Sequence, residues 1–368
     1  MKKQKRFNVA FTGDGLFLPI RNGGYYSIYH LMQALSKTRM VEPTFAHCYR
    51  GWENPKLFCH QPFNTLFFKP EDYYRDTGIL NYAFSILNIQ AVQILNAEEV
   101  LNLGRRLQRT KVKVIYEIPN IDYVLYGQLG MDEEHVGKMK RQQSEACFIA
   151  DHVLCRSEND KSHLVQIGVE HDKVMVYRGA IYVKGIQFRP RQRKRFRIVF
   201  LGHMYYPPNE NALKQIVTHV LPQLKKLDHR YNLTVIGIAP QSMVEDYSHR
   251  GVVFKGGVDN LSAELLRYDI AIAPLYEGSG TRLKILDHMA SGMPIVTTTL
   301  GIAGLKESIA RYVIIEDDIH RYANCIHAIM QNLTDYQPLM YEGRKFVETH
   351  YDWSLCLDPF LNIYQTLL

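Results

Sequence analysis

Short apolar runs recur along the chain and alternate with longer amphipathic segments. Such runs, apolar at successive positions, are typical of strands buried on both faces of a parallel sheet. In the first half they predict strands at 7–11, 111–115 and 152–155, and a helix that opens at 22–24 and runs through Ser36. In the second half they predict strands at 197–201, 233–236, 252–254, 269–273, 295–298 and 312–315, with helices after Asn209 and from Arg282.

This alternation predicts an α/β protein with two Rossmann-like domains, because parallel strands need helical crossovers between them. The length of 368 residues also fits two domains better than one. We expect an N-terminal domain at 1–188, a basic linker at 189–196 and a C-terminal domain at 197–345. Two such sheets are expected to face a central cleft and to bind ligands at the carboxyl ends of their strands.

One loop of the second half has the features of an anion-binding site. Pro274 ends the strand before it, because proline has no N–H group for the sheet. Gly278 and Gly280 allow backbone N–H groups to come close to a ligand. The helix that begins near Arg282 directs its unpaired N–H groups and about half a positive charge at the same place.

The same helix start adds formal charges of both signs. Arg282 and Lys284 supply two cations. With Leu283, Leu286 and Ala290 on the buried side, Lys284 and Asp287 lie three residues apart on one polar face. Cations suit phosphates and a carboxylate suits ribose hydroxyls, so the segment predicts binding of a nucleoside diphosphate.

Two segments carry a family resemblance, Phe200-Leu-Gly-His-Met-Tyr-Tyr-Pro-Pro-Asn209 and Gly278-Ser-Gly-Thr-Arg-Leu-Lys284. They resemble glycosyltransferase family 4, whose members are retaining, sugar-nucleotide-dependent enzymes with the GT-B fold. The resemblance implies that the segment 346–368 is a terminal helix that crosses back to the first domain. It also implies donor contacts from the loop, namely Gly278, Ser279, Gly280, Thr281 and Leu283.

In that family, two acidic residues separated by seven others bracket the loop. The second binds ribose hydroxyls and corresponds here to Asp287. The first contacts the donor sugar and corresponds to Ser279, which is not an acid, and this departure leaves the donor sugar open. Glu277 lies two residues upstream and replaces the missing acid only if the loop is remodelled.

The resemblance adds candidates in the first domain. The paired Gly23 and Gly24 at a helix start would bring backbone amides to the donor phosphate or to the acceptor, and an ordinary turn is the alternative. The family often places a histidine near the reacting carbon, and the comparable strand end here carries Glu117. A carboxylate there would accept a proton or stabilise an oxocarbenium-like centre, and a solvated surface residue is the alternative.

Three further candidates lie in the second domain. His203 follows the strand 197–201 at the mouth of the expected cleft. Many relatives have an arginine and a lysine in this loop for phosphate, a duty that Arg282 and Lys284 are expected to take over here. Gly257 and Val258 follow the strand 252–254 and are base contacts by resemblance, with a plain turn as the alternative.

These features predict transfer of a sugar from a nucleoside diphosphate sugar to an acceptor hydroxyl with retention of configuration. The sequence has no Asp-x-Asp motif, so a bridging metal is not implied, and no other cofactor is expected. Two rival functions remain open. One is a sugar-nucleotide epimerase of the same fold, and the other is a non-catalytic subunit that binds nucleotide or glycan, motivated by Ser279.

Composition agrees with a globular protein, with 46% hydrophobic and 22% charged residues. The six cysteines show no Cys-x-x-Cys spacing, so the sequence indicates neither a zinc site nor a disulfide framework. A reducing cytoplasm is therefore the predicted compartment.

The formal net charge of +7 comes largely from two basic clusters, 2–6 and 189–197. The second cluster is interpreted as a solvated linker, with a surface that contacts anionic lipid at the inner face of the membrane as the alternative. Nucleic acid is not expected as a partner, because the clusters lack interleaved aromatic residues.

The segment 77–97 is uncharged and has the length of a membrane span. Its five amides, Asn81, Asn88, Gln90, Gln93 and Asn96, would each need a partner in hydrocarbon. A buried helix followed by a strand is therefore the predicted structure.

Overall fold

The computed structural model describes residues 6–13, 18, 23–51, 53–278 and 280–367. The chain divides into two compact units, the first formed by 1–178 together with 356–368 and the second by 179–355. The second unit thus begins earlier than the expected linker, and the returning segment begins later than residue 346.

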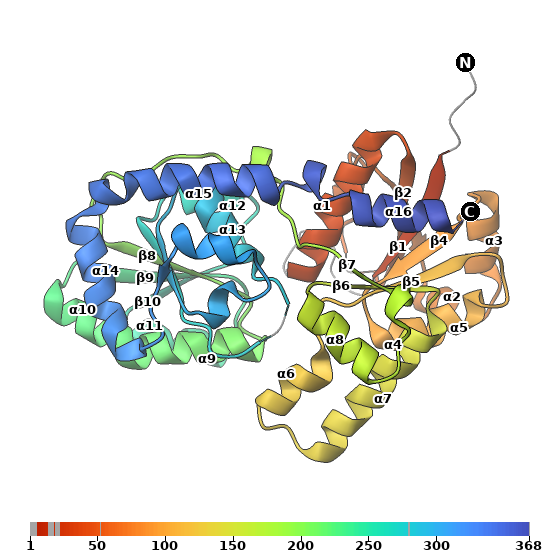
Figure 1. Cartoon of the computed structure of the whole chain (residues 1–368), viewed down its shortest axis with the longest axis horizontal. Helices are drawn as coiled ribbons and strands as arrows, with labels where there is room; N and C mark the ends of the chain where they lie inside the picture. The colour runs from red at the N-terminus through yellow and green to blue at the C-terminus, as the bar shows by residue number, and fades with distance from the viewer. Residues whose placement is uncertain (1–5, 14–17, 19–22, 52, 279, 368) are drawn as a thin grey trace. The chain divides into compact units, whose positions relative to one another are not determined.

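The first unit contains a parallel sheet of seven strands in the order β3-β2-β1-β4-β5-β6-β7 (Figure 1). Its strands are β1 (Phe7–Gly13), β2 (Val41–Cys48), β3 (Asn64–Phe68), β4 (Ala91–Ile94), β5 (Lys113–Glu117), β6 (His152–Cys155) and β7 (Val174–Val176). Its helices are α1 (Gly23–Thr38), α2 (Pro70–Tyr74), α3 (Ile79–Ile86), α4 (Ala97–Glu99), α5 (Arg105–Leu107), α6 (Asp122–Gln128), α7 (Glu133–Ile149), α8 (Glu158–Gln166) and α16 (Asp358–Thr366). A π-helical stretch, η2 (Val100–Gly104), joins α4 to α5.

Strand β4 shows how this sheet separates its two faces. Successive side chains of a strand point to opposite faces. Val92 and Ile94 belong to the core on one face, together with Leu80 of α3. Gln93 points to the other face, where its Oε1 accepts a hydrogen bond of 2.7 Å from the hydroxyl of Tyr364 in α16. The last helix of the chain is therefore part of the first unit.

The second unit contains a parallel sheet of six strands in the order β10-β9-β8-β11-β12-β13. Its strands are β8 (Arg197–Leu201), β9 (Asn232–Ile236), β10 (Val252–Gly256), β11 (Ile270–Ala273), β12 (Ile295–Thr297) and β13 (Ile314–Ile315). Its helices are α9 (Pro207–Gln215), α10 (Leu221–Leu227), α11 (Gln241–His249), α12 (Leu261–Leu265), α13 (Leu283–Ala290), α14 (Tyr322–Gln331) and α15 (Gln337–His350). A π-helical stretch, η5 (Ile216–Val220), joins α9 to α10.

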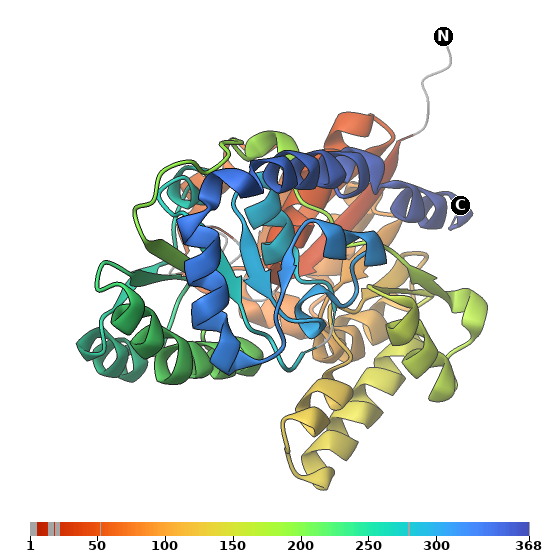
Figure 2. The ribbon, with the colours of Figure 1, turned by 60° about the vertical axis from the view of Figure 1, so that its left-hand side comes forward.

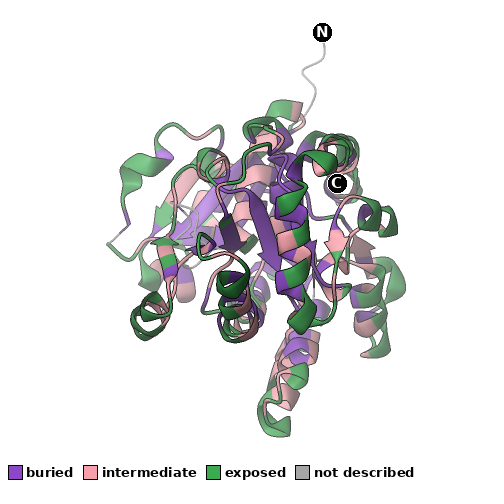
Figure 3. Ribbon diagram, turned by 90° about the vertical axis from the view of Figure 1, so that its left-hand side faces the viewer, coloured by how far each residue is buried: buried purple, intermediate pink, exposed green. Residues whose placement is uncertain are grey.

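Helices cover both faces of this second sheet, with α12, α13 and α15 on one side and α9, α10 and α11 on the other (Figures 1 and 2). All residues of β11 and β12 are buried, as apolar runs without alternation predict. Figure 3 shows the same division, with buried strands inside and the exposed surfaces of the helices outside. The predicted α/β class with two parallel sheets is confirmed.

The stretch 189–196 is only partly solvated, because Gln192, Arg193 and Lys194 are exposed whereas Arg191 and Phe196 are buried. Arg191 is buried, and its guanidinium donates hydrogen bonds of 2.7–2.8 Å to the carbonyl oxygens of Leu265, Tyr268 and Ser291. The Leu265 and Ser291 oxygens lie at the ends of α12 and α13, where carbonyl groups lack partners within the helix. Burial lowers the pKa of Arg191 to about 9. Arg195 donates to the buried carboxylate of Asp269 at 3.0 Å, so this part of the cluster is bound within the second unit.

The uncharged segment 77–97 forms a helix and a strand, α3 and β4, as predicted, but the prediction that the helix is buried is wrong. Strand β4 is wholly buried, whereas α3 exposes part of its surface. Among the helices formed by the described residues, none combines the length and the apolar character that crossing a bilayer requires.

Candidate functional site

The carboxyl ends of β8 and β9 meet at a point where the two backbones nearly touch. A Cβ atom at Gly237, whose φ is +139°, would lie 1.8 Å from the carbonyl oxygen of Gly202. Only glycine fits there, because any side chain would overlap the neighbouring backbone. This edge of the sheet, where all six parallel strands end, carries the predicted donor site.

The loop after β11 has the backbone that the sequence predicts. Gly278 and Gly280 have positive φ values of 114° and 72°. The loop leads into α13, which begins at Leu283 with Arg282 as its N-cap residue. Ser279 lies outside the described residues.

The side chain of Arg282 turns back onto its own loop. Its Nη1 donates to the carbonyl oxygen of Gly280 at 2.5 Å, and its Nη2 donates to that of Gly278 at 2.7 Å. The side chain is 8% exposed. The guanidinium therefore ties the carbonyl oxygens of Gly278 and Gly280 to the start of α13 and also places a positive charge there.

Lys284 connects the two segments that carry the family resemblance. Its Nζ donates to Oδ1 of Asn209 at 2.6 Å and lies 5.0 Å from the centre of the Phe200 ring. The amide of Asn209 in turn donates to the carbonyl oxygen of His203 at 3.0 Å. Burial, followed by the positive charge of Arg282, lowers the pKa of Lys284 to about 7.

Asn209 is the site residue that was not proposed as a donor contact from the sequence. It is buried at the start of α9 and holds both the loop after β8 and the ammonium of α13. The available signal was the Tyr206-Pro-Pro-Asn209 turn, whose prolines place Asn209 in the first turn of a helix.

Asp287 lies one turn after Lys284 and is buried. The next residue, His288, is fully buried in the same helix. Burial, together with the charges of Lys284 and Arg191, lowers the pKa of His288 to about 3, so its ring is neutral at neutral pH. The helix thus presents cations at its first turn and a neutral imidazole one turn further along.

The remaining second-unit candidates lie around this helix start or at the far end of the sheet. His203 is half-buried at the end of β8, and burial lowers its pKa. The hydroxyl of Thr281 is buried, and no described residue satisfies it with a hydrogen bond. Gly257 is exposed and Val258 half-buried in the turn after β10, three strands away from β11. The loop residues and His203 therefore lie near the start of α13. Gly257 and Val258 lie three strands further along the edge of the sheet.

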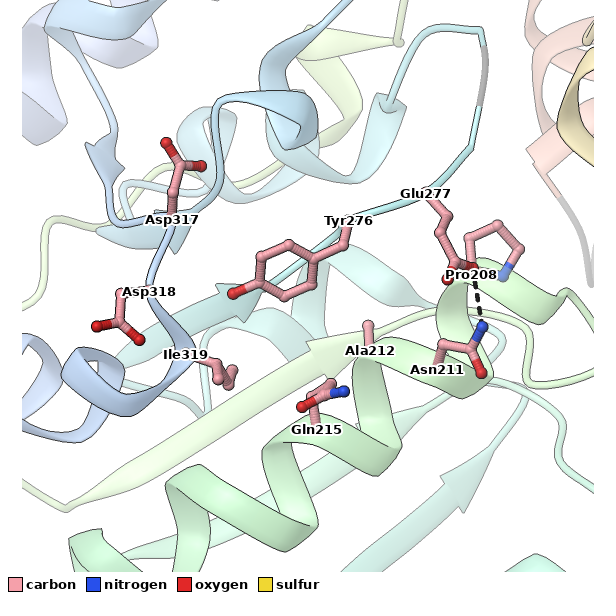
Figure 4. Close-up of a pocket in the computed structure, with 9 residues that line it drawn as sticks. All are labelled: Pro208, Asn211, Ala212, Gln215, Tyr276, Glu277, Asp317, Asp318 and Ile319. Atoms are coloured by element: carbon pink, nitrogen blue, oxygen red, sulfur yellow. Dashed lines mark hydrogen bonds between the residues drawn. The ribbon is translucent and has the colours of Figure 1, made fainter. Parts of the chain in front are cut away.

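Glu277 points away from the loop interior. Its Oε2 accepts a hydrogen bond of 2.8 Å from the Asn211 amide on α9 (Figure 4). It lines a pocket of about 310 Å³ between α9 and the segments that follow β11 and β13. The other lining residues are Pro208, Asn211, Ala212, Gln215, Tyr276, Asp317, Asp318 and Ile319. Glu277 thus faces α9 in this structure, and its replacement of the missing acid stays a prediction.

Glu117 in the first unit is not an exposed carboxylate. It is fully buried at the end of β5. Its Oε1 accepts hydrogen bonds from Nη2 of Arg156 at 3.0 Å and from the hydroxyl of Tyr177, and its Oε2 accepts one from Gln93 at 2.5 Å. The alternative of a solvated carboxylate is wrong, because three core donors already hold both oxygens, and the catalytic role stays a prediction.

Gly23 and Gly24 are the first two residues of α1. Gly23 is exposed, and a Cβ atom there would meet no described atom within 4 Å. Packing within the described chain therefore does not demand glycine at position 23, and the predicted contact with donor or acceptor stays a prediction.

Comparison with known proteins agrees with the geometry of the second unit. Residues 195–332, which include both segments joined by Lys284 and Asn209, match the family model described as Glycosyl transferases group 1. An uncharacterised 44.6 kDa protein from the cps region of Klebsiella pneumoniae is 27% identical over 164 residues, 42% of each chain. A phosphatidyl-myo-inositol mannosyltransferase of Propionibacterium freudenreichii is 28% identical over 169 residues, 43% of this chain and 40% of the relative. The chain thus matches about two fifths of the length of these curated relatives.

Solved structures resemble the chain along nearly its whole length. Anabaena HepE in complex with UDP and glucose has a TM-score of 0.74 at 11% identity, covering 98% of this chain and 99% of that one. Sucrose-phosphate synthase from Thermosynechococcus elongatus has a TM-score of 0.76 at 14% identity, with the same coverage. A pneumococcal O-GlcNAc transferase, GtfA, in complex with UDP and GlcNAc has a TM-score of 0.69 at 9% identity. The fold is therefore that of the GT-B glycosyltransferases.

Proposed function

We propose that this protein is a retaining glycosyltransferase that moves a sugar from a nucleoside diphosphate sugar to an acceptor hydroxyl. The observation that carries the proposal is the hydrogen bond between Lys284 and Asn209, which joins the two segments that carry the family resemblance at one sheet edge. The family match over 195–332 covers both of these loops. The GT-B fold, shared with proteins solved with UDP, supports the same donor class.

In the proposed reaction the leaving diphosphate gains negative charge as the glycosidic bond breaks. The start of α13 and the ammonium of Lys284 would stabilise that charge without rearrangement, because their positions are already fixed. Arg282 would act by charge and by holding the loop carbonyls turned away from the phosphates. In this proposal these cations take the place of a bridging metal, and Asp287 binds the ribose hydroxyls.

The proposal is tested first by nucleotide binding and then by product analysis. Among uridine, guanosine, adenosine and thymidine diphosphates, we expect uridine diphosphate to raise the melting temperature most. Ligand at about one hundred times its dissociation constant adds roughly 2.7 kcal/mol of stability. Product analysis with the matching sugar nucleotide should then show sugar on an acceptor. An epimerised donor, or binding without any turnover, would instead establish one of the two rival functions.

We expect Asp287→Ala to weaken nucleotide binding measured by calorimetry, because the variant lacks the carboxylate for the ribose. Asp287 is buried, so Asp287→Asn serves as the variant that keeps the side-chain shape if the alanine variant fails to fold. Asp335→Ala, at an exposed position of the same unit, is the matched control and should bind as the wild type does. Equal affinity of a folded Asp287 variant and the wild type would remove the ribose role.

Lys284 should make diphosphate binding depend on pH. Because its pKa is lowered to about 7, the ammonium form predominates only below that pH. A bound diphosphate favours the ammonium, so binding should take up a proton, and affinity should fall by up to about tenfold per unit as pH rises above 7. Calorimetry above about pH 7.5 avoids the phosphate's own ionisation near 6. Lys284→Arg should abolish this pH dependence, and an unchanged slope in that variant would contradict the assignment.

A further inference from the structure

The pocket between α9 and the segments that follow β11 and β13, which we call the α9 pocket, has an acidic lining. Three carboxylates line it, that of Glu277 at one end and those of Asp317 and Asp318 at the other (Figure 4). Its described lining includes no lysine or arginine, although the chain carries a formal net charge of +7. Like charges gathered in one pocket repel one another, so a cation that enters it is stabilised.

Neutral groups hold these carboxylates in place. Both oxygens of Asp317 accept hydrogen bonds from Thr299, from its backbone N–H at 2.8 Å and from its hydroxyl at 2.7 Å. One oxygen of Asp318 accepts from the backbone N–H of His320 at 2.9 Å, and one oxygen of Glu277 accepts from a side-chain amide of α9 at 2.8 Å. Among the ion pairs formed by described residues of the second unit, none includes these carboxylates, so their charges are not neutralised.

A buried hydroxyl beside the same pocket has no partner in the described part of the chain. Tyr322, the first residue of α14, is fully buried, and its Oη forms no hydrogen bond with a described group. It follows the lining residue Ile319 by one turn of 3₁₀ helix, so the two side chains lie on the same side. Burial raises the pKa of Tyr322, and Tyr276 and Asp317 of the pocket lining raise it further. A hydrogen-bonding group that the protein leaves unused therefore lies behind the lining.

The α9 pocket lies apart from the residues predicted to bind the donor. Asp287, the predicted ribose contact, belongs to α13 on one side of the second sheet, whereas α9 covers the other side (Figure 1). The lining residues Ala212 and Gln215 come three and six residues after Asn209, which binds Lys284. The predicted base contacts follow β10, at the opposite edge of the sheet from β13. A donor bound as predicted would leave this pocket open to another ligand.

The lining suits a small organic ammonium ion. An ammonium group has three N–H donors and no acceptor, which matches a lining rich in carboxylate oxygens. Tyr276 is 43% exposed, so the face of its ring is open to a cation. The volume of about 310 Å³ is enough for a small molecule, and the described residues form no cluster of ligands for a bare metal ion.

We infer that the α9 pocket binds a small organic ammonium ion between the carboxylates of Glu277 and Asp318, against the ring of Tyr276. Amino sugars and aliphatic amines both carry this group, and they differ in the hydroxyls of the sugar ring. The inference adds a second ligand site to the second unit and does not depend on the proposed sugar transfer.

The experiment is isothermal titration calorimetry of the full chain at about pH 6.5, where amines are cationic. The probes are glucosamine and putrescine, which carry ammonium groups, and N-acetylglucosamine, which is the neutral counterpart of the first. We expect both amines to bind, their affinity to fall as ionic strength rises, and N-acetylglucosamine not to bind. Tighter binding of glucosamine would assign the site to amino sugars, and tighter binding of putrescine would assign it to aliphatic amines.

The double variant Glu277→Gln, Asp318→Asn removes two charges but keeps a side-chain oxygen for each hydrogen bond, so the local structure is retained. It should lower amine affinity by about tenfold. The control Asp259→Asn, Glu307→Gln makes the same change of net charge at exposed positions of the same unit and should bind as the wild type does. Tyr322→Phe should weaken binding by roughly twofold to tenfold without lowering the melting temperature, because its hydroxyl has no described partner to lose.

Three results would overturn the inference. They are equal affinity for glucosamine and N-acetylglucosamine, no binding of either amine by the wild type, and wild-type affinity in the double variant. Circular dichroism establishes that each variant is folded. Absence of sugar transfer would refute only the proposed function, because the calorimetry measures amine binding alone.

Discussion

Replacing Glu117 by alanine is expected to destabilise the first unit by about 3–5 kcal/mol, because it leaves a buried guanidinium without its counter-charge. Arg156 is only 5% exposed and pairs with Glu117 at 3.0 Å. Tyr177 and Gln93 would lose their acceptor as well. A loss of this size lowers the melting temperature by about 10 °C in a domain of this length. Thermal unfolding followed by circular dichroism measures it.

Two further variants sharpen this test. Glu117→Gln keeps the shape and one acceptor oxygen, so its loss of stability should be smaller than that of the alanine variant. Glu170→Ala, at an exposed position of the same unit, should change stability by less than about 0.5 kcal/mol. If Glu117→Ala kept its stability but lost sugar transfer, the carboxylate would be catalytic and its assignment to the core would be incorrect.

Arg282→Ala is expected to lower kcat/KM for sugar transfer by about 2–4 kcal/mol of transition-state stabilisation, the range for loss of one oxyanion donor. The variant loses a positive charge at the start of α13. It also loses the hydrogen bonds to Gly278 and Gly280, so the loop backbone is no longer held in position. Steady-state kinetics with the sugar nucleotide that stabilises the wild type measures the effect.

A lysine at the same position separates charge from geometry. Arg282→Lys keeps the charge but cannot bridge two carbonyl oxygens with a planar fork. We expect it to lose most of what the alanine variant loses, since the structure commits both guanidinium nitrogens to the loop. Arg250→Ala, an exposed arginine of the same unit, is the control. Wild-type turnover in Arg282→Ala would exclude a role for this side chain in the reaction.

Strands with continuous apolar runs were predictable, and strands with polar or proline residues were not. The predicted strands 152–155 and 197–201 coincide with β6 and β8. Strand β2 was missed because Glu42 and Pro43 interrupt its pattern. The structure tolerates Pro43 because the pairing of β2 with β3 begins only at Thr44. Tertiary pairing of this kind leaves no trace in the local sequence.

The candidate site likewise contains some features that the sequence predicted and others that it did not. The sequence predicted the glycine backbone of the loop and the helix start, because both depend on local residue types. It did not predict that Glu117 is buried or that Arg191 binds helix ends, since the partners of these side chains lie far away in the chain. Charged residues are usually exposed, and only the fold reveals which ones are enclosed.

The return of the chain to its first unit has a consequence for biosynthesis. Phe360, Ile363 and Tyr364 of α16 are buried, and Tyr364 is hydrogen-bonded to Gln93, 271 positions earlier. A ribosome therefore releases the whole second unit before it releases the piece that completes the first. Domains usually fold in the order in which they are made. Here the half synthesised first is the half finished last, and a nascent chain that stalls before residue 356 would carry an incomplete N-terminal core.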